Sequence, residues 1–163
     1  MSEERALAAL DAAGIEYRVV RHGRVRSLAE AAAARGIAPR ALLKSIVVRR
    51  ADDDFLFVLV PGDREISWPK LRALLGVNRI SMPDADTALA VTGYERGTIT
   101  PFGSTRAWPV VVDEAVVGQE ISLGAGAHGV GVVVQADDAI RALDARVADI
   151  SDEPATHDQT ATN

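Results

Sequence analysis

The sequence predicts a single α+β domain, and three observations lead to this fold class. The chain has 163 residues, a length that fits one domain with a substantial core. Helical patterns come first, helices and β-branched strand patterns then mix, and short strand patterns follow late in the chain. No internal repeat or linker divides the sequence. We therefore expect one domain over residues 1–150, followed by a polar, disordered tail over 151–163.

In the first half of the chain, capping residues and glycines mark the ends of the predicted helices. Ser27 and Glu30 form a capping-box pattern, which predicts a helix over 28–35 that ends at Gly36. The other elements expected here are a helix over 5–13 ended by Gly14, a strand over 15–20, a helical turn from Pro39, strands over 45–49 and 55–60 around a charged hairpin tip at 52–54, and a helix from Ser67 to Gly76.

The second half is expected to contain more strands than helices. The elements predicted in order are a strand over 79–81, a helix over 84–91, a glycine-rich loop over 93–103, strands over 110–113, 115–117 and 120–123, a second glycine-rich loop over 124–129, a strand over 130–134, a helix capped by Asp137, and a short strand over 147–150.

Composition and missing motifs exclude several functional classes. The chain has no cysteine, so disulfides, thiolate zinc sites and a cysteine nucleophile are excluded. No apolar run approaches the length needed to span a membrane and no signal-peptide pattern is present, so we expect a cytoplasmic protein. A net charge of −5 argues against coating nucleic acid through bulk charge, although a local basic patch for one end of an RNA remains compatible with it. No P-loop, dinucleotide fingerprint, metal-ligand cluster or serine elbow occurs.

The loop from Gly93 to Gly103 has the composition of a shaped, stiff segment. It combines three glycines with Pro101, which fixes one torsion and biases Thr100 toward an extended conformation. Such a loop can present backbone N–H and C=O groups to a small polar ligand. The alternative is a structural turn between a helix and a strand.

Three further positions are candidates for chemistry. Lys44 sits between an apolar helical turn and an apolar strand, where it could place a charge on a phosphate or carboxylate; the alternative is a strand-end lysine that reaches the surface. His128, in the second glycine-rich loop, is either a hydrogen-bonding or proton-accepting group or an exposed loop histidine. His22 lies among Arg21, Arg24 and Arg26, which form either a basic rim for RNA phosphates or a solvated loop.

With these residues in view, the chain resembles the YbaK/EbsC-type aminoacyl-tRNA editing domains. This group includes the free-standing Cys-tRNA(Pro) and Ala-tRNA(Pro) deacylases and the editing insertion of bacterial prolyl-tRNA synthetase. The matching segments are Leu42–Val48, Phe57–Asp63, Lys70–Gly76 and Gly93–Gly103. The resemblance covers about residues 3–150, and its specific parts are Lys44 and the Gly-x-x-x-Pro-x-Gly element over 97–103.

The resemblance implies a mixed, barrel-like β-sheet surrounded by helices and the hydrolysis of a wrong amino acid from the 3′ end of a tRNA. Lys44 would contact the terminal phosphate or ribose of the substrate, while the loop would hold the aminoacyl-adenosine by its backbone. The implied catalytic residues are Lys44, Gly97, Pro101 and Gly103, and the implied substrate-binding residues are Thr100, Phe102, His128 and Gly129. No metal or other cofactor is expected.

The implied substrate is tRNA(Pro) carrying a small amino acid such as Cys or Ala. The expected partners are therefore the 3′ end of an aminoacyl-tRNA and, as a further candidate, prolyl-tRNA synthetase, but neither a membrane nor DNA. Two alternatives remain open: a non-catalytic module that binds a tRNA end or a nucleotide, and an interaction protein of a synthetase. The first is suggested by Gly97-Thr98, which stands where many relatives have two consecutive glycines.

Overall fold

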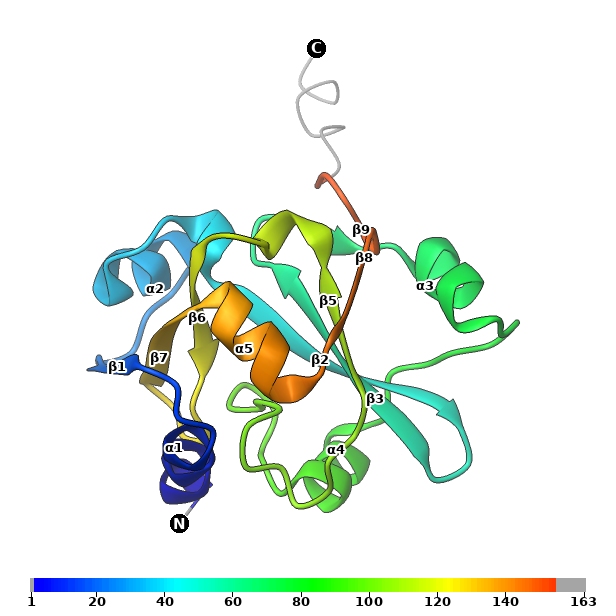
Figure 1. Cartoon of the computed structure of the whole chain (residues 1–163), viewed down its shortest axis with the longest axis horizontal. Helices are drawn as coiled ribbons and strands as arrows, with labels where there is room; N and C mark the ends of the chain where they lie inside the picture. The colour runs from blue at the N-terminus through cyan, green and yellow to red at the C-terminus, as the bar shows by residue number, and fades with distance from the viewer. Residues whose placement is uncertain (1, 155–163) are drawn as a thin grey trace.

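The computed structural model of the chain describes residues 2–154 and has an α+β architecture (Figure 1). The α-helices in this range are α1 (Ser2–Ala12), α2 (Leu28–Arg35), α3 (Trp68–Leu75), α4 (Ala85–Thr92) and α5 (Ala136–Leu143). Short 3₁₀ turns span η1 (Pro39–Ala41) and η2 (Glu114–Val116). The strands are β1 (Tyr17–Arg21), β2 (Leu43–Ala51), β3 (Asp54–Pro61), β4 (Glu65–Ile66), β5 (Val110–Asp113), β6 (Glu120–Gly124), β7 (Val130–Gln135), β8 (Arg146–Ala148) and β9 (Ser151–Asp152).

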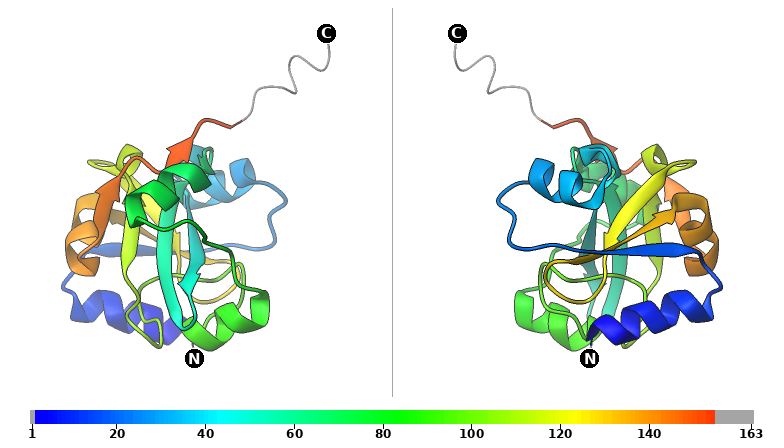
Figure 2. Two further views of the ribbon diagram at one scale, coloured as in Figure 1. Left: turned by 90° about the vertical axis from the view of Figure 1, so that its right-hand side faces the viewer. Right: turned by 90° about the vertical axis from the view of Figure 1, so that its left-hand side faces the viewer.

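A four-stranded mixed sheet forms the centre of the molecule, with strand order β2-β3-β5-β8. The hairpin of β2 and β3 is antiparallel, while β5 and β8 add to it in parallel. Strand β3 is buried on both faces, because Phe57 and Leu59 pack into one apolar cluster and Leu56 and Val58 into another. Helix α3 covers the second cluster, and the left-hand view of Figure 2 shows it lying over the hairpin.

A second sheet of three antiparallel strands, in the order β1-β7-β6, packs on the other side of the larger apolar cluster. A single parallel bridge between Leu42 and Ser122 connects the start of β2 to β6. The two sheets do not join further within residues 2–154, so the α+β domain is confirmed but the barrel-like sheet is not closed.

The loop after α4 is attached to α1 by the side chain of Arg5. Its Nε donates to the carbonyl oxygen of Gly103 at 3.0 Å and its Nη2 to that of Gly93 at 3.0 Å, so one guanidinium group holds both ends of the loop. The same group lies 4.6 Å from the centre of the Tyr94 ring. The Tyr94 hydroxyl in turn donates to the carbonyl oxygen of Phe102 at 2.7 Å inside the core. The loop is therefore a fixed part of the domain.

Several sequence expectations need correction. Residues 115–117 do not form a strand, because the buried carboxylate of Asp113 accepts a hydrogen bond from the Ala115 amide at 3.1 Å and caps the 3₁₀ turn η2. The expected strand over 79–81 is reduced to one isolated bridge between Ser81 and Arg49. Asp137 lies inside α5, whose N-cap is Gln135.

The end of the domain also differs from the expected boundary. The chain continues past residue 150 into β9, which pairs with β4 and buries Ser151. The greater part of the expected tail, residues 155–163, lies outside the described residues.

Replacing Tyr94 by Phe tests whether the loop is fixed from inside the core. The change leaves the buried carbonyl of Phe102 without its donor, so we expect a loss of about 1–3 kcal/mol in the free energy of unfolding. Tyr17→Phe is the matched control, since its hydroxyl makes an exposed bond to Asp11 and its loss should cost less than about 0.5 kcal/mol. Urea unfolding of both variants measures the difference, and equal losses would contradict a fixed loop.

Candidate functional site

The outer edge of β2 is open between two bridges, and a cavity lies along this opening. Strand β2 pairs with β3 on one side only, and its other edge is bridged at Leu42 and at Arg49. Between these points, Lys44, Ser45 and Ile46 line a cavity of about 400 Å³. Its remaining walls come from α2, from the loop after α4 and from the end of β6. The cavity thus joins segments that are distant in sequence.

Lys44 is one of two lysines in the chain and lies on the wall of this cavity. Its ammonium nitrogen donates to the carbonyl oxygen of Arg64 at 2.6 Å. Arg64 is itself attached to β9, because its Nε donates to the Ser151 hydroxyl at 2.7 Å. An ammonium group has three N–H donors, so two remain for a ligand after the bond to Arg64. The lysine is exposed, yet a fixed acceptor restricts its position.

The loop after α4 contributes Gly97 and Ile99 to the same cavity. Neither of their amide N–H groups donates a hydrogen bond within residues 2–154. Between them, Thr98 turns into the protein: it is 3% exposed, and its hydroxyl donates to the Glu95 carbonyl oxygen at 2.7 Å. Two residues that line the cavity together with Lys44 therefore have amide N–H groups without an acceptor among residues 2–154.

The second half of the predicted loop motif does not line this cavity. Thr100, Pro101 and Phe102 are buried, and Phe102 belongs to the main apolar cluster. Gly103 has a φ of 76°, and a Cβ there would lie 2.5 Å from the Arg5 carbonyl oxygen, so only glycine fits. These four positions lie behind the cavity wall, in places where they fix the shape of the loop.

A second cavity of about 620 Å³ adjoins the first one. It is lined by the predicted residues His128 and Gly129 and by the His22 segment, while Gly97 and Arg35 belong to both cavities. His128 is exposed, and its Nε2 lies 3.5 Å from a carboxylate oxygen of Glu95. The Gly129 carbonyl oxygen accepts a hydrogen bond from the His22 amide at 2.9 Å, which joins the start of β7 to the end of β1.

Sequence reasoning missed Arg35 and Ser45. Arg35 ends α2 just before the Gly36 cap, where a basic residue is common for helix-dipole reasons, so its position in the sequence gave no signal of a site. Ser45 follows Lys44, and its hydroxyl oxygen is buried without a hydrogen-bond partner among the described residues. The strand pattern placed Ser45 correctly, but only coordinates reveal the unpaired hydroxyl beside the cavity.

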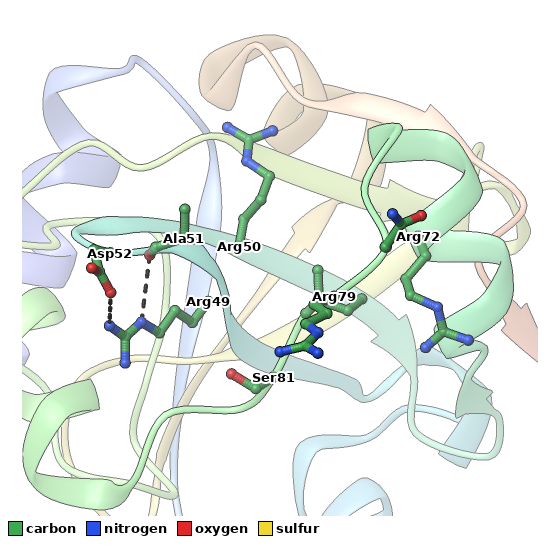
Figure 3. Close-up of a pocket in the computed structure, with 9 residues that line it drawn as sticks. Arg49, Arg50, Ala51, Asp52, Arg72, Arg79 and Ser81 are labelled. Atoms are coloured by element: carbon green, nitrogen blue, oxygen red, sulfur yellow. Dashed lines mark hydrogen bonds and ion pairs between the residues drawn. The ribbon is translucent and has the colours of Figure 1, made fainter.

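Arginine side chains gather around a third hollow near the far end of β2 (Figure 3). Arg49, Arg50, Arg72 and Arg79 line this groove of about 590 Å³, which we call the arginine groove. Asp52 is the acidic residue in its wall and pairs with Arg49 at 2.6 Å.

The charges of the arginine groove are only partly neutralised. Figure 3 shows the side chains of Arg49 and Arg50 leaving β2 in opposite directions, and Arg50 pairs with Asp54 at 3.0 Å. Arg72 and Arg79 have no ion pair within the part of the chain that the structure describes. The groove therefore carries an excess of positive charge on a protein whose net charge is negative.

Residues 2–154 lack two other kinds of feature. They contain no cluster of three His, Asp or Glu side chains that could hold a metal ion. None of their helices has the length and apolar character needed to cross a membrane.

The sequence matches the family model described as the aminoacyl-tRNA editing domain over residues 22–142. Among curated proteins, it is 38% identical over 77 residues to the proline–tRNA ligase of Lactobacillus gasseri and 35% identical over 92 residues to that of Bacillus licheniformis. These matches cover 47% and 56% of this chain but only 14% and 16% of the two ligases. The chain thus corresponds to a small part of those enzymes.

A solved structure with the same fold agrees with the match to the editing-domain family. A solved structure described as a candidate trans-editing enzyme for prolyl tRNA synthetase superposes with a TM-score of 0.85. The match covers 93% of this chain and 97% of the other, at 24% sequence identity. At this level of identity, the likeness establishes the fold.

Proposed function

The chain belongs to the aminoacyl-tRNA editing domain family, and on that premise we propose that it is a trans-acting deacylase of mischarged tRNA. Its substrate would be the ester that joins a small amino acid, such as Ala or Cys, to the terminal adenosine of tRNA(Pro). One observation carries the proposal: Lys44 shares a cavity with Gly97 and Ile99, whose amides have no acceptor within residues 2–154.

The discrimination problem explains why such an enzyme is useful. A synthetase pocket built for proline cannot strongly reject a slightly smaller side chain, because a methylene group is worth only about 1–3 kcal/mol. A separate hydrolytic pocket supplies the missing selectivity by admitting the small amino acid. The apolar walls beside Lys44, which include Leu42, Leu43 and Ile46, suit a small side chain.

The chemistry requires little more than orientation and charge stabilisation. An aminoacyl ester is already activated, and the neighbouring 2′-hydroxyl of the ribose can assist a water molecule that attacks the ester carbon. The bond from this carbon to the ribose oxygen then breaks, the amino acid leaves, and the ribose regains its hydroxyl. Attack on the ester carbonyl places negative charge on its oxygen. In the proposed mechanism the Gly97 and Ile99 amides donate to this oxyanion and Lys44 supplies a positive charge nearby.

The arginine groove supports an extended nucleic-acid substrate. Arg49 and Lys44 are five residues apart on β2, which corresponds to about 17 Å at the usual rise of a strand. About five stacked nucleotides span this distance. With the terminal adenosine beside Lys44, the groove would meet phosphates of the tRNA acceptor stem. The positive groove on an acidic protein thus favours a substrate that continues beyond the ester.

A deacylation panel tests the proposal. Purified protein is incubated with Ala-, Cys-, Ser- and Pro-tRNA(Pro), and the loss of each amino acid is followed. We expect release of at least one small non-cognate amino acid and retention of proline. The proposal fails if no aminoacyl-tRNA is hydrolysed at protein concentrations comparable to that of the tRNA. Tight binding of a non-hydrolysable aminoacyl-adenosine without turnover would favour a non-catalytic module instead.

Lys44→Ala should lower the deacylation rate by about 10²- to 10³-fold, the usual effect of losing one group that stabilises an oxyanion. Its stability should change little, because the side chain is exposed. Lys70→Ala is the matched control: the ammonium of this other lysine pairs with Asp149 and Asp152 and lines neither of the two adjoining cavities. A Lys44→Ala variant as active as Lys70→Ala would remove Lys44 from the site.

Arg79→Ala should weaken tRNA binding without changing the single-turnover rate at saturation. Losing one phosphate contact should reduce the slope of log K against log salt by about one. Arg141→Ala is a suitable control, since Arg141 lies on α5 and pairs with Asp138. Equal salt slopes in the two variants would show that the arginine groove does not contact the tRNA.

A further inference from the structure

Arg35 occupies the junction of the two adjoining cavities. Together with Gly97, it lines both the 400 Å³ cavity beside Lys44 and the 620 Å³ cavity beside His22 and His128. The side chain crosses from the end of α2 to the β6–β7 sheet and packs over Gly131, where a Cβ would lie 2.5 Å from the Arg35 Cζ. The absence of a side chain at residue 131 thus creates the space that the guanidinium group fills.

Three hydrogen-bond acceptors hold this guanidinium group in place. Its Nη1 donates to the Ser122 hydroxyl at 3.0 Å and to the Leu123 carbonyl oxygen at 3.5 Å, while its Nε donates to His22 Nε2 at 3.4 Å. The Nη2 group makes no hydrogen bond within residues 2–154. Two N–H donors on a fixed, planar cation are therefore left for a ligand.

The positive charge of Arg35 also lacks a counterion. None of its hydrogen-bond partners is a carboxylate, and it forms no ion pair among the described residues. Burial lowers the pKa of the Arg35 guanidinium below its ordinary value, because removal from water disfavours the charged form. A partly buried cation without a counterion is costly unless an anion joins it.

We propose that Arg35 binds the phosphate group on the 5′ side of the terminal adenosine, at the junction of the two cavities. This inference rests on the proposed function, which places the ester beside Lys44. The ribose would then lie next to Gly97, and the adenine would enter the larger cavity near His22 and His128. The 5′ phosphate extends from the ribose, within reach of the free Nη2 group of Arg35. A guanidinium group suits this role because its planar donors match phosphate oxygens.

The proposal gives Arg35 and Lys44 different roles in binding the substrate. With the phosphate on Arg35, the ammonium group of Lys44 is left for the ribose and the ester. Arg35 is then a binding residue, whose loss weakens the attachment of the nucleotide without changing the chemical step.

Binding of adenosine 5′-monophosphate and of adenosine tests the proposal without any hydrolysis. The two ligands differ only in the phosphate, and their dissociation constants are measured by NMR titration of the full chain. We expect the wild-type protein to bind the monophosphate about tenfold more tightly, as for one charge-assisted contact. Arg35→Gln should bind both ligands equally, with an unchanged affinity for adenosine. Arg35→Lys keeps the positive charge but lacks the planar N–H donors of the guanidinium group, so it should show an intermediate preference for the monophosphate.

Arg40→Gln is the matched control, because Arg40 is exposed on η1 and lines neither of the two cavities. It should keep the wild-type preference, and thermal unfolding of each variant reports folding. If Arg35→Gln does not fold, the comparison of Arg35→Lys with wild type decides. The proposal is overturned if the wild-type protein binds the two ligands equally or binds neither, or if the preference survives in Arg35→Gln. If the preference for the monophosphate depends on Arg35 but the protein has no deacylase activity, the result supports the phosphate site and contradicts the proposed function.

Discussion

The site depends most on the hydrogen bonds that the Arg5 guanidinium group donates to the carbonyl oxygens of Gly93 and Gly103. This group connects the first helix to both ends of the loop over 93–103 and lies on the Tyr94 ring beneath it. Both ends of the loop are thus bound to one side chain, while its middle borders the cavity beside β2. Gly97 and Ile99 line the same cavity as Lys44. Arg5, which is far from the cavity residues in sequence, thus anchors the loop that carries these two backbone amides.

The loop motif therefore has two parts with different tasks. The buried half, from Thr100 to Gly103, fixes conformation: Thr100 accepts from the Phe102 amide, and Gly103 adopts a conformation suited to glycine. The outer half, Gly97 and Ile99, borders the cavity. The sequence motif includes residues from both halves of the loop. The family resemblance therefore implies that Pro101 and Gly103 are catalytic residues together with Gly97. The structure places Pro101 and Gly103 where they would act through the shape of the loop.

Most elements could be predicted because local signals agree with the global fold. Helix α2 begins after the Ser27 cap and ends at Gly36, as the capping box predicts. The η2 turn could not be predicted, because the Asp113 carboxylate outweighs the strand preference of the residues that follow it. The apolar context of Lys44 singles it out in the sequence, and the structure places it on the wall of a cavity. Arg35 is not singled out in this way, because its importance depends on the space above Gly131, which no local pattern reveals.

The central claim is that a lysine and two backbone amides surround the carbonyl oxygen of the ester. A crystal structure with an amide-linked alanyl-adenosine, which resists hydrolysis, tests it most directly. The account predicts the alanyl carbonyl oxygen within about 3.1 Å of the Gly97 or Ile99 amide nitrogen, with the Lys44 ammonium beside the same oxygen and the ribose. A ligand bound with that oxygen in solvent, or on a surface away from Lys44, would contradict it.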